Sequence, residues 1–266
     1  MTSATQTLGS AERWGPLWGA RPDDWALSED QQLPTYEAAL QRVPLQRGQR
    51  VLDVGCGVGA FLRLVADGGA EPFGLDASEA LIDLARRRVP EADLRVGDME
   101  ALPYDANTFD LVTGFTSFFF ANDMVAALRE AGRVAKPGAP VVIQVWGAHE
   151  RCSLEAMKEI ARPFFPPRPP DAPPEPDLSQ QGVLEALAIK AGLKPETSFQ
   201  TSWAYTYPNK ETLGRALVAP AGVAVLVGPE REEAIKAAIV EGLSEHRTPG
   251  GSYSLDNEYH YLIASA

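Results

Sequence analysis

The chain is poor in cysteine, in histidine and in positive charge, and each shortage excludes a class of function. Its 266 residues include two cysteines, Cys56 and Cys152, and three histidines, too few for a disulfide framework or a zinc cluster. Lysine and arginine together number 24 against 36 aspartates and glutamates, a net charge of −12, which disfavours binding to a phosphate backbone. We therefore expect no metal site and no nucleic-acid partner.

Long hydrophobic runs and a secretory leader are also lacking. The longest nearly apolar stretch, 217–228, is too short and too rich in glycine and proline to span a bilayer. Residues 1–10 have neither the basic nor the apolar region of a signal peptide. These features predict a soluble, cytoplasmic protein with no membrane partner, and the length suits one large domain with a cap.

The chain does have a regular alternation of strand and helix patterns between residues 49 and 147. Buried strands are predicted at 51–54, 71–76, 93–96, 109–115 and 141–146. Such alternation is typical of a doubly wound α/β fold with a mostly parallel sheet. Two later strands, at 199–207 and 253–261, have all of their aromatic residues on one of their two alternating faces, and we expect them to be antiparallel strands at a sheet edge.

The flanking segments divide the chain further. The sequence of residues 1–47 predicts a frayed tail up to residue 12, followed by short helices that carry three tryptophans. These helices either act as a lid or pack permanently on the core. Residues 48–149 form the first half of the sheet. Eight of the fourteen residues from 163 to 176 are proline, which predicts extended backbone in a cap segment over 150–178. Residues 179–266 complete the sheet and carry a helical insertion at 210–250, which we expect to define substrate specificity together with the cap.

A glycine-rich turn follows the first strand, in the sequence DVGCGVG over residues 53–59. Glycines let the backbone turn sharply and let a ligand approach it closely. Asp53, at the end of that strand, would repel the pyrophosphate of a dinucleotide and attract a cation. Asp76 ends the next strand, where a carboxylate can accept hydrogen bonds from two ribose hydroxyls. Asp98 follows the third strand and is suited to accept from an exocyclic amine.

Four motifs in this order resemble those of class I S-adenosylmethionine (SAM) dependent methyltransferases, with the small-molecule branch as the best match. They are DVGCGVG at 53–59, GLD at 74–76, GDMEALP at 97–103 and FDLV at 109–112. The resemblance covers roughly residues 48–147 and implies a Rossmann-like sheet of seven strands whose last strand is antiparallel. It implies SAM as methyl donor, S-adenosylhomocysteine (SAH) as product, and cofactor contacts from Asp53, Gly55, Cys56, Gly57, Asp76, Ala77, Asp98, Met99, Gly114 and Phe115.

Aromatic residues gather near the expected mouth of the site and favour a small, apolar or aromatic substrate. They are Phe118, Phe119, Trp146, Trp203, Tyr205 and Trp18. Core packing is the alternative for each one taken singly. His149 is the histidine expected closest to the transferred methyl group, as a general base for a hydroxyl acceptor or as a surface-loop residue without a role.

Other functions stay open at this point. A SAM-binding protein with altered chemistry would keep the same motifs. An NAD-linked oxidoreductase would also use a glycine-rich turn, but Asp53 disfavours it. A non-catalytic interaction module built on the proline-rich segment would leave the four motifs unexplained. We expect a small-molecule substrate as partner and a monomer or homodimer, while the acceptor atom is left open among oxygen, nitrogen and carbon.

Overall fold

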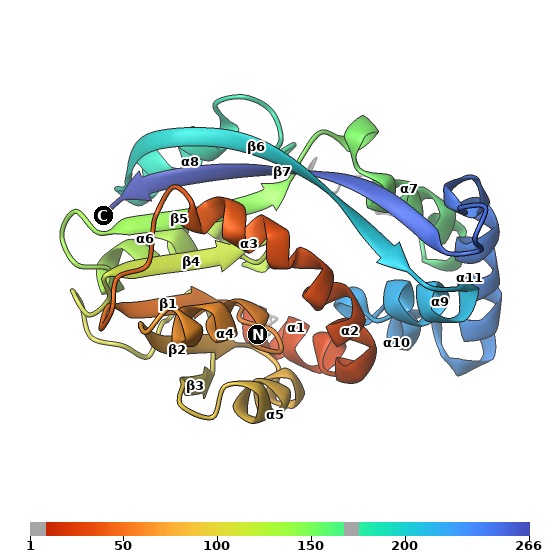
Figure 1. The fold of residues 1–266 in the computed structure, drawn as a ribbon, viewed down its shortest axis with the longest axis horizontal. Coiled ribbons are helices and arrows are strands. Elements are labelled where there is room, and N and C mark those ends of the chain that lie inside the picture. The colour runs from red at the N-terminus through yellow and green to blue at the C-terminus, as the bar shows by residue number, and fades with distance from the viewer. Residues whose placement is uncertain (1–8, 168–175) are drawn as a thin grey trace, which may run out of the picture.

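A twisted sheet of seven strands runs through the computed structural model, which describes residues 9–167 and 176–266 (Figure 1). The strands lie in the order β3-β2-β1-β4-β5-β7-β6. Their bounds are β1 Arg50–Val54, β2 Glu71–Asp76, β3 Asp93–Val96, β4 Leu111–Phe115, β5 Pro140–Trp146, β6 Lys194–Tyr207 and β7 Tyr253–Ser265.

The first five strands are parallel, and β7 is antiparallel to both of its neighbours, β5 and β6. Strand β1 carries three apolar residues, and four of its five residues are buried, because helices cover both faces of the sheet. The strand order reverses between β1 and β4, which is the place where ligands bind in open α/β sheets. The predicted fold, including the antiparallel last strand, is confirmed.

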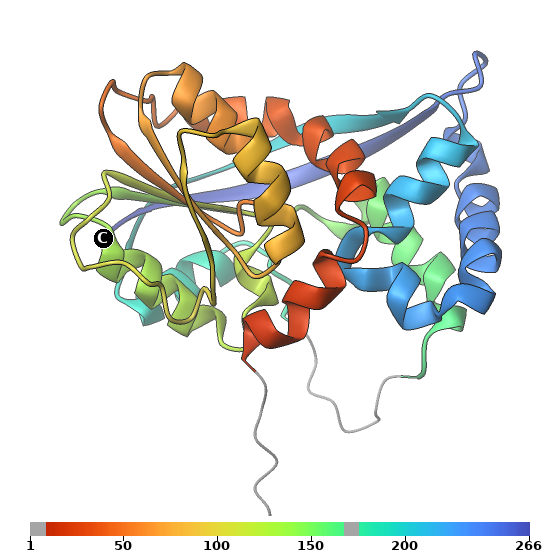
Figure 2. The same ribbon diagram turned by 90° about the horizontal axis from the view of Figure 1, so that it is seen from below.

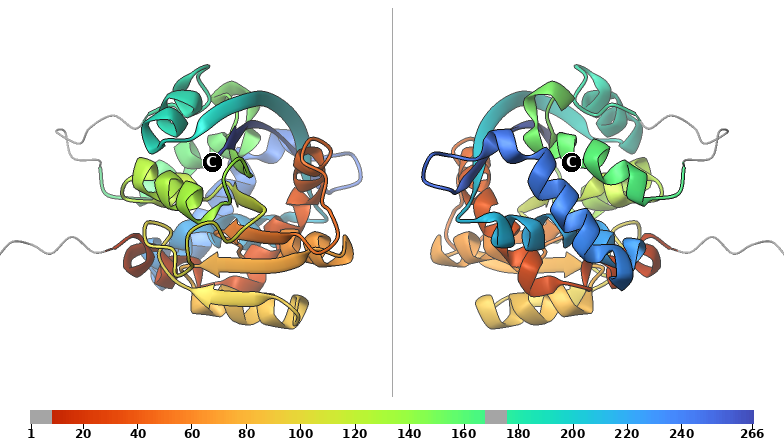
Figure 3. Two further views of the ribbon diagram at one scale, coloured as in Figure 1. Left: turned by 90° about the vertical axis from the view of Figure 1, so that its left-hand side faces the viewer. Right: turned by 90° about the vertical axis from the view of Figure 1, so that its right-hand side faces the viewer.

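Helices form a layer on each face of the sheet (Figures 2 and 3). Helices α3, α4 and α5 contribute to the apolar cluster on one face, and α6 and α8 to the cluster on the other. The helix bounds are α1 Ser10–Trp18, α2 Pro22–Glu29, α3 Leu33–Leu40, α4 Ala60–Asp67, α5 Glu79–Arg88, α6 Met124–Val134, α7 Ser153–Ala161, α8 Val183–Ala191, α9 Lys210–Val218, α10 Val223–Val227 and α11 Pro229–Gly242.

Strands β6 and β7 are the longest, at 14 and 13 residues. They continue beyond the parallel strands and carry α9, α10 and α11 at their far end, next to α7 (Figure 1). Helix α11 begins at Pro229, within the predicted helical insertion at 210–250. Helices α1 and α2 pack between this helical cap and the parallel half of the sheet (Figure 2).

Three expectations about local structure need correction. Strand β7 is interior, not at an edge, so the polar residues Glu258 and His260 on its second face are buried; the edge strand is β6. Residues 10–12 are not part of a frayed tail, because α1 begins at Ser10. Within the proline-rich segment, Arg162–Phe164 forms a short 3-10 helix, while residues 168–175 lie outside the described residues.

In the part of the chain that the structure describes, no helix combines the length and the apolar character needed to cross a membrane. The same residues contain no group of three or more acidic, histidine or cysteine side chains arranged to hold a metal ion.

Candidate functional site

The glycine turn begins where β1 ends, at the reversal of strand order. Its first two amides, those of Gly55 and Cys56, donate to the carbonyl oxygen of Leu75 at 2.7 and 3.0 Å, which joins the turn to the end of β2. Gly55 and Gly57 both have positive φ, at 80° and 54°, and a side chain at Gly55 would overlap Ser117. Glycine is therefore required by conformation and by space.

Asp76 closes this turn from the neighbouring strand. Its Oδ2 accepts from the Gly57 amide at 3.0 Å and its Oδ1 accepts from the Ser78 amide at 2.8 Å. Burial raises the pKa of this carboxyl group, against the opposing effect of these hydrogen bonds. Ser78 in turn caps α5, since its Oγ accepts from the Leu81 amide at 3.2 Å. Each oxygen of Asp76 keeps a lone pair for a ligand.

Asp53 lies beneath the turn, with 3% of its surface exposed. Its Oδ1 accepts from the Thr113 hydroxyl on β4 at 2.7 Å. Desolvation, together with the neighbouring carboxylates of Glu29 and Asp76, raises its pKa to about 8 against the opposing effect of the Thr113 hydrogen bond. Cys56 is buried beside it with its thiol close to Gly74, so the thiol fills space, and burial raises its pKa well above the usual value.

Asp98 is held by the first helix of the chain. The Ser10 hydroxyl donates to its Oδ1 at 2.5 Å, and the Ala11 amide donates to its Oδ2 at 3.0 Å. Partial desolvation raises the pKa of Asp98, but the hydrogen bonds from Ala11, Ser10 and Glu100 outweigh it and lower the pKa overall. The residue that the resemblance assigns to the adenine amine is therefore in contact with the N-terminal segment.

A fourth carboxylate, Glu29, was missed by the sequence analysis. It ends α2, and its two oxygens accept from the amides of Val58 and Ala60 at 2.7 and 2.9 Å, just beyond the glycine turn. The indole of Trp25 donates to it at 2.8 Å. The spacing of Trp25 and Glu29, four residues apart in a helical segment, was the available signal that an indole and a carboxylate share one face. Burial raises the pKa of Glu29 to about 7, opposed by these amide hydrogen bonds.

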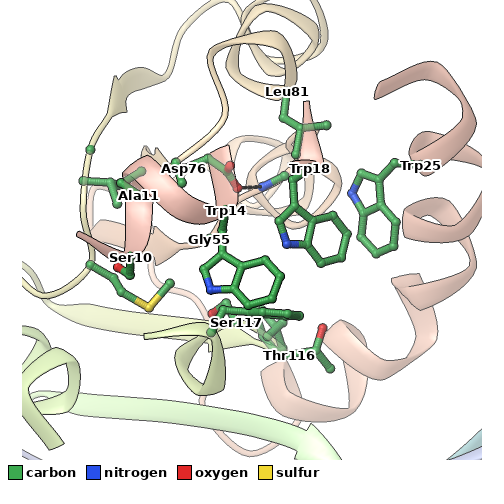
Figure 4. Close-up of a pocket in the computed structure, with 17 residues that line it drawn as sticks. Ser10, Ala11, Trp14, Trp18, Trp25, Gly55, Asp76, Leu81, Thr116 and Ser117 are labelled. Atoms are coloured by element: carbon green, nitrogen blue, oxygen red, sulfur yellow. Dashed lines mark hydrogen bonds between the residues drawn. The ribbon is translucent and has the colours of Figure 1, made fainter. Parts of the chain in front are cut away.

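A cavity adjoins the turn and is lined by α1, α2 and the ends of β1, β2, β3 and β4 (Figure 4). Of the predicted cofactor residues, it is lined by Gly55, Gly57, Asp76, Ala77, Met99 and Phe115. Asp53, Cys56, Asp98 and Gly114 lie behind this lining. None of the described lining residues is lysine, arginine or histidine. The buried carboxylates around the cavity therefore suit a ligand that carries positive charge.

Aromatic side chains form the opposite side of the same cavity. Trp14, Trp18 and Trp25 project into it from α1 and α2 (Figure 4). Trp14 and Trp18 make edge-to-face contacts with Phe120, at ring-centroid distances of 5.0 and 5.3 Å, and Trp18 makes one with Trp25 at 4.8 Å. Thr116, also in the lining, has a φ of 49°, and such strain in a β-branched residue is typical of functional sites.

Most residues predicted for the substrate lie elsewhere, and Trp18 alone among those six described residues lines the cavity. Phe118 is a core residue whose ring covers Gly114. Phe119 packs against Phe120 and Trp146 against Tyr259, while Tyr205 is buried and Trp203 is 44% exposed on the edge strand. For Phe118 and Phe119 the reason is that Phe118–Phe120 forms a 3-10 turn, which directs only Phe120 of the three into the cavity.

His149 lies in a short 3-10 turn after β5, and 62% of its side chain is exposed. Its Nδ1 is 3.5 Å from the Glu155 carboxylate, and it is absent from the cavity lining. The position favours the alternative of a surface-loop histidine over the expected general base.

Comparison with known proteins agrees with this geometry. Residues 52–143 match the family described as a methyltransferase domain. Demethylmenaquinone methyltransferase of Renibacterium salmoninarum is 34% identical over 139 residues, which are 46% of this chain and 59% of that protein. Malonyl-[acyl-carrier protein] O-methyltransferase of Enterobacter lignolyticus is 30% identical over 167 residues, 62% of each chain. The matched stretches thus span about three fifths of these relatives' own length.

Solved structures show the same fold. The [4+2]-cyclase SpnF superimposes with a TM-score of 0.58 at 21% identity, over 87% of this chain and 79% of that one. The family match falls on the strands and turns that bring Asp53, Gly55 and Asp76 together. Residues 52–143 are therefore similar in sequence to methyltransferase domains, as the four motifs predict, and a relative from Mycolicibacterium smegmatis, 31% identical over 129 residues, is named as a probable SAM-dependent methyltransferase.

Proposed function

We propose that this chain transfers a methyl group from SAM to a small, apolar or aromatic molecule. The observation that carries the proposal is the shared cavity, which has the glycine turn and Asp76 on one side and an indole and phenyl wall on the other. A cofactor held against the turn would present its reactive end to that wall. Aromatic and apolar walls with few polar groups favour acceptors of the same character.

The chemistry supplied by SAM is a methyl group on a positively charged sulfur that leaves as a neutral thioether. The chain's own residues bind, orient and exclude water. In this proposal Asp76 holds the ribose hydroxyls, and Ala77 and Met99 flank the adenine ring. The tryptophans of α1 and α2 cover the reacting atoms and keep water from them. No general base is assigned, because His149 is on the surface.

The cap and the N-terminal segment complete this proposal. We assign residues 1–47 to a lid over the cofactor, and we assign the cap helices α9–α11 together with the 150–178 segment to substrate selection. Ion pairs link the two: Arg215 to Asp24 at 2.5 Å and Arg21 to Glu232 at 2.5 Å. A cytoplasmic location and a monomer or homodimer are part of the proposal.

Altered chemistry on a SAM-binding scaffold is the second proposal, and one observation favours it. The structural neighbour SpnF is named as a [4+2]-cyclase, so this fold accommodates reactions other than methyl transfer.

Calorimetric titration with SAM, SAH and NAD tests the cofactor, and transfer of labelled methyl from SAM to a panel of quinols, phenols, amines and carboxylic acids tests the reaction. We expect binding of SAM and SAH without binding of NAD, and label transfer to an aromatic or apolar acceptor. Binding of SAM without consumption over the whole panel would favour altered chemistry. Binding of NAD alone would contradict both proposals.

A further inference from the structure

Glu29 occupies a position that normally attracts negatively charged ligands. The glycine turn leads directly into α4, so the backbone amides of Val58 and Ala60 lie at the N-terminal end of that helix. Amides at a helix N-terminus, together with the helix dipole, form an anion-binding site, which dinucleotide-binding folds use for pyrophosphate. Here a carboxylate of the chain itself accepts from both amides.

The Glu29 carboxylate also covers the glycine turn from above. A side chain at Gly57 would overlap its Oε2 atom, so the carboxylate lies directly against Gly57, which lines the cavity. Only 3% of Glu29 is exposed. Backbone amides and the Trp25 indole donate hydrogen bonds that stabilise its ionised form. Arg88 is the basic side chain that lowers its pKa, but it acts at longer range and forms an ion pair with Asp30 at 2.8 Å.

We propose that Glu29 is the specificity-determining residue that reverses the charge preference of the glycine turn, excluding anionic tails and favouring the ammonium group of a cofactor. The inference rests on the placement of SAM proposed above. In this proposal the N-terminal segment, through Glu29, selects cationic over anionic cofactor tails in addition to the motif residue Asp53. With the amides occupied, a phosphate tail finds a carboxylate in place of donors, whereas an ammonium group finds an acceptor.

Three adenosine ligands separate this role from a merely structural one. SAH carries an amino-acid tail with an ammonium group, 5′-methylthioadenosine lacks the amino acid, and ADP carries an anionic tail. In the wild type we expect SAH to bind more tightly than methylthioadenosine, and methylthioadenosine more tightly than ADP. The reverse order of the last two would overturn the proposal without any variant.

The variant Glu29→Gln removes the charge and keeps one acceptor. We expect the preference for SAH over methylthioadenosine to fall by about tenfold, the size of one hydrogen bond between charged groups, and the preference for methylthioadenosine over ADP to fall as well. Glu29→Asp keeps the charge and should keep both preferences. Asp23→Asn, which removes an exposed carboxylate from the same helix, is the matched control and should change neither.

The outcomes are distinguishable from failure of the proposed function. Equal weakening of all three ligands in Glu29→Gln would mean that Glu29 only holds the segment in place, and it would overturn the inference. Unchanged ratios, or equal loss in Glu29→Asp and Glu29→Gln, would overturn it too. A wild type that binds neither SAH nor methylthioadenosine would contradict the proposed function itself.

Discussion

Asp76 joins two roles in one carboxylate, because the same oxygens that accept from the Gly57 and Ser78 amides point toward the cavity. Replacement by alanine removes the acceptors for a ribose and leaves two amides without a partner. We expect Asp76→Ala to weaken SAH binding by about 10- to 150-fold, from roughly 1.5–3 kcal/mol for a hydrogen bond to a charged group. Calorimetric titration measures this change.

The matched control is Asp83→Ala on the exposed face of α5, where the carboxylate pairs with Arg86 at 2.7 Å. Exposed pairs of this kind contribute little, so SAH affinity should stay within twofold of the wild type. Unchanged affinity in Asp76→Ala would exclude Asp76 from the cofactor site.

Single residues were predictable where their role depends on a neighbouring motif. Asp53, Asp76 and Asp98 end or follow strands, and the order of the strands brings them to one edge of the sheet. Glu29 was not predictable in this way, because its partners lie about 30 residues further along and the contact depends on how α2 packs on the turn. The left-handed conformation of Thr116 was equally hidden, since nothing in its residue type requires it.

Helix α1 depends on one glycine for its position over the cavity. A side chain at Gly15 would overlap the backbone carbonyl of Ala77, while alanine has the higher helix propensity. We expect Gly15→Ala to keep α1 helical but to displace it, and to weaken SAH binding by about 5- to 150-fold, from roughly 1–3 kcal/mol of overpacking. Hydrogen exchange of the α1 amides and titration with SAH measure the two effects.

Gly214 in α9 provides the control for the Gly15→Ala variant of α1, because the nearest atom to a Cβ added at Gly214 is 3.6 Å away. Gly214→Ala should leave amide exchange in α1 and SAH affinity unchanged. If Gly15→Ala bound SAH as tightly as the wild type, the contact between α1 and the adenine side of the cavity would have no role in cofactor binding.

Among the elements, the central parallel strands β1, β4 and β5 were predicted well, because burial on both faces leaves segments of mainly apolar residues. Strand β7 was wrongly placed at an edge, because its alternating polar residues read as a solvent-facing side. Glu258 on this face is buried with partners: it accepts from the Ala148 amide at 3.2 Å and pairs with Arg151 at 3.0 Å. An alternating pattern shows which face of a strand is polar. That face is exposed to solvent only when no other segment supplies hydrogen-bond partners for its polar side chains.

At the scale of the whole molecule, the buried carboxylates give the cofactor-free protein an unusual pH dependence. Burial raises the pKa of Glu29 to about 7 and of Asp53 to about 8, above the values expected in the unfolded chain. Between pH 5 and 8 the folded state therefore binds more protons than the unfolded state, so stability falls as pH rises through this range. We expect the melting temperature to decrease from pH 5 to pH 8.

Two variants test which carboxyl groups cause the decrease of the melting temperature with pH. Asp53→Asn removes one raised pKa and should flatten the decrease above pH 5. Asp110→Asn is the control, since desolvation of Asp110 is outweighed by Lys136 and its other partners and its pKa is lowered. It should lower the melting temperature by a similar amount throughout pH 5 to 8, leave the slope in that range unchanged, and alter the pH dependence only at more acidic pH. A melting temperature that rises between pH 5 and 8 in the wild type would contradict the prediction.

The cap helices and the N-terminal helices are held on the sheet in different ways. Strands β6 and β7 pair from Lys194 and Ser265 to Tyr207 and Tyr253, with one irregularity near Pro195. A long antiparallel ladder of backbone hydrogen bonds therefore attaches the cap helices to the sheet. The N-terminal segment, by contrast, is held by side-chain contacts at Asp98 and Glu29 and by ion pairs. Helices α1 and α2, which line the cavity, are thus anchored through side chains, whereas the cap helices that they contact are anchored through paired backbone. A larger acceptor would therefore be admitted more easily by changing the contacts of α1 and α2 than by reshaping the cap.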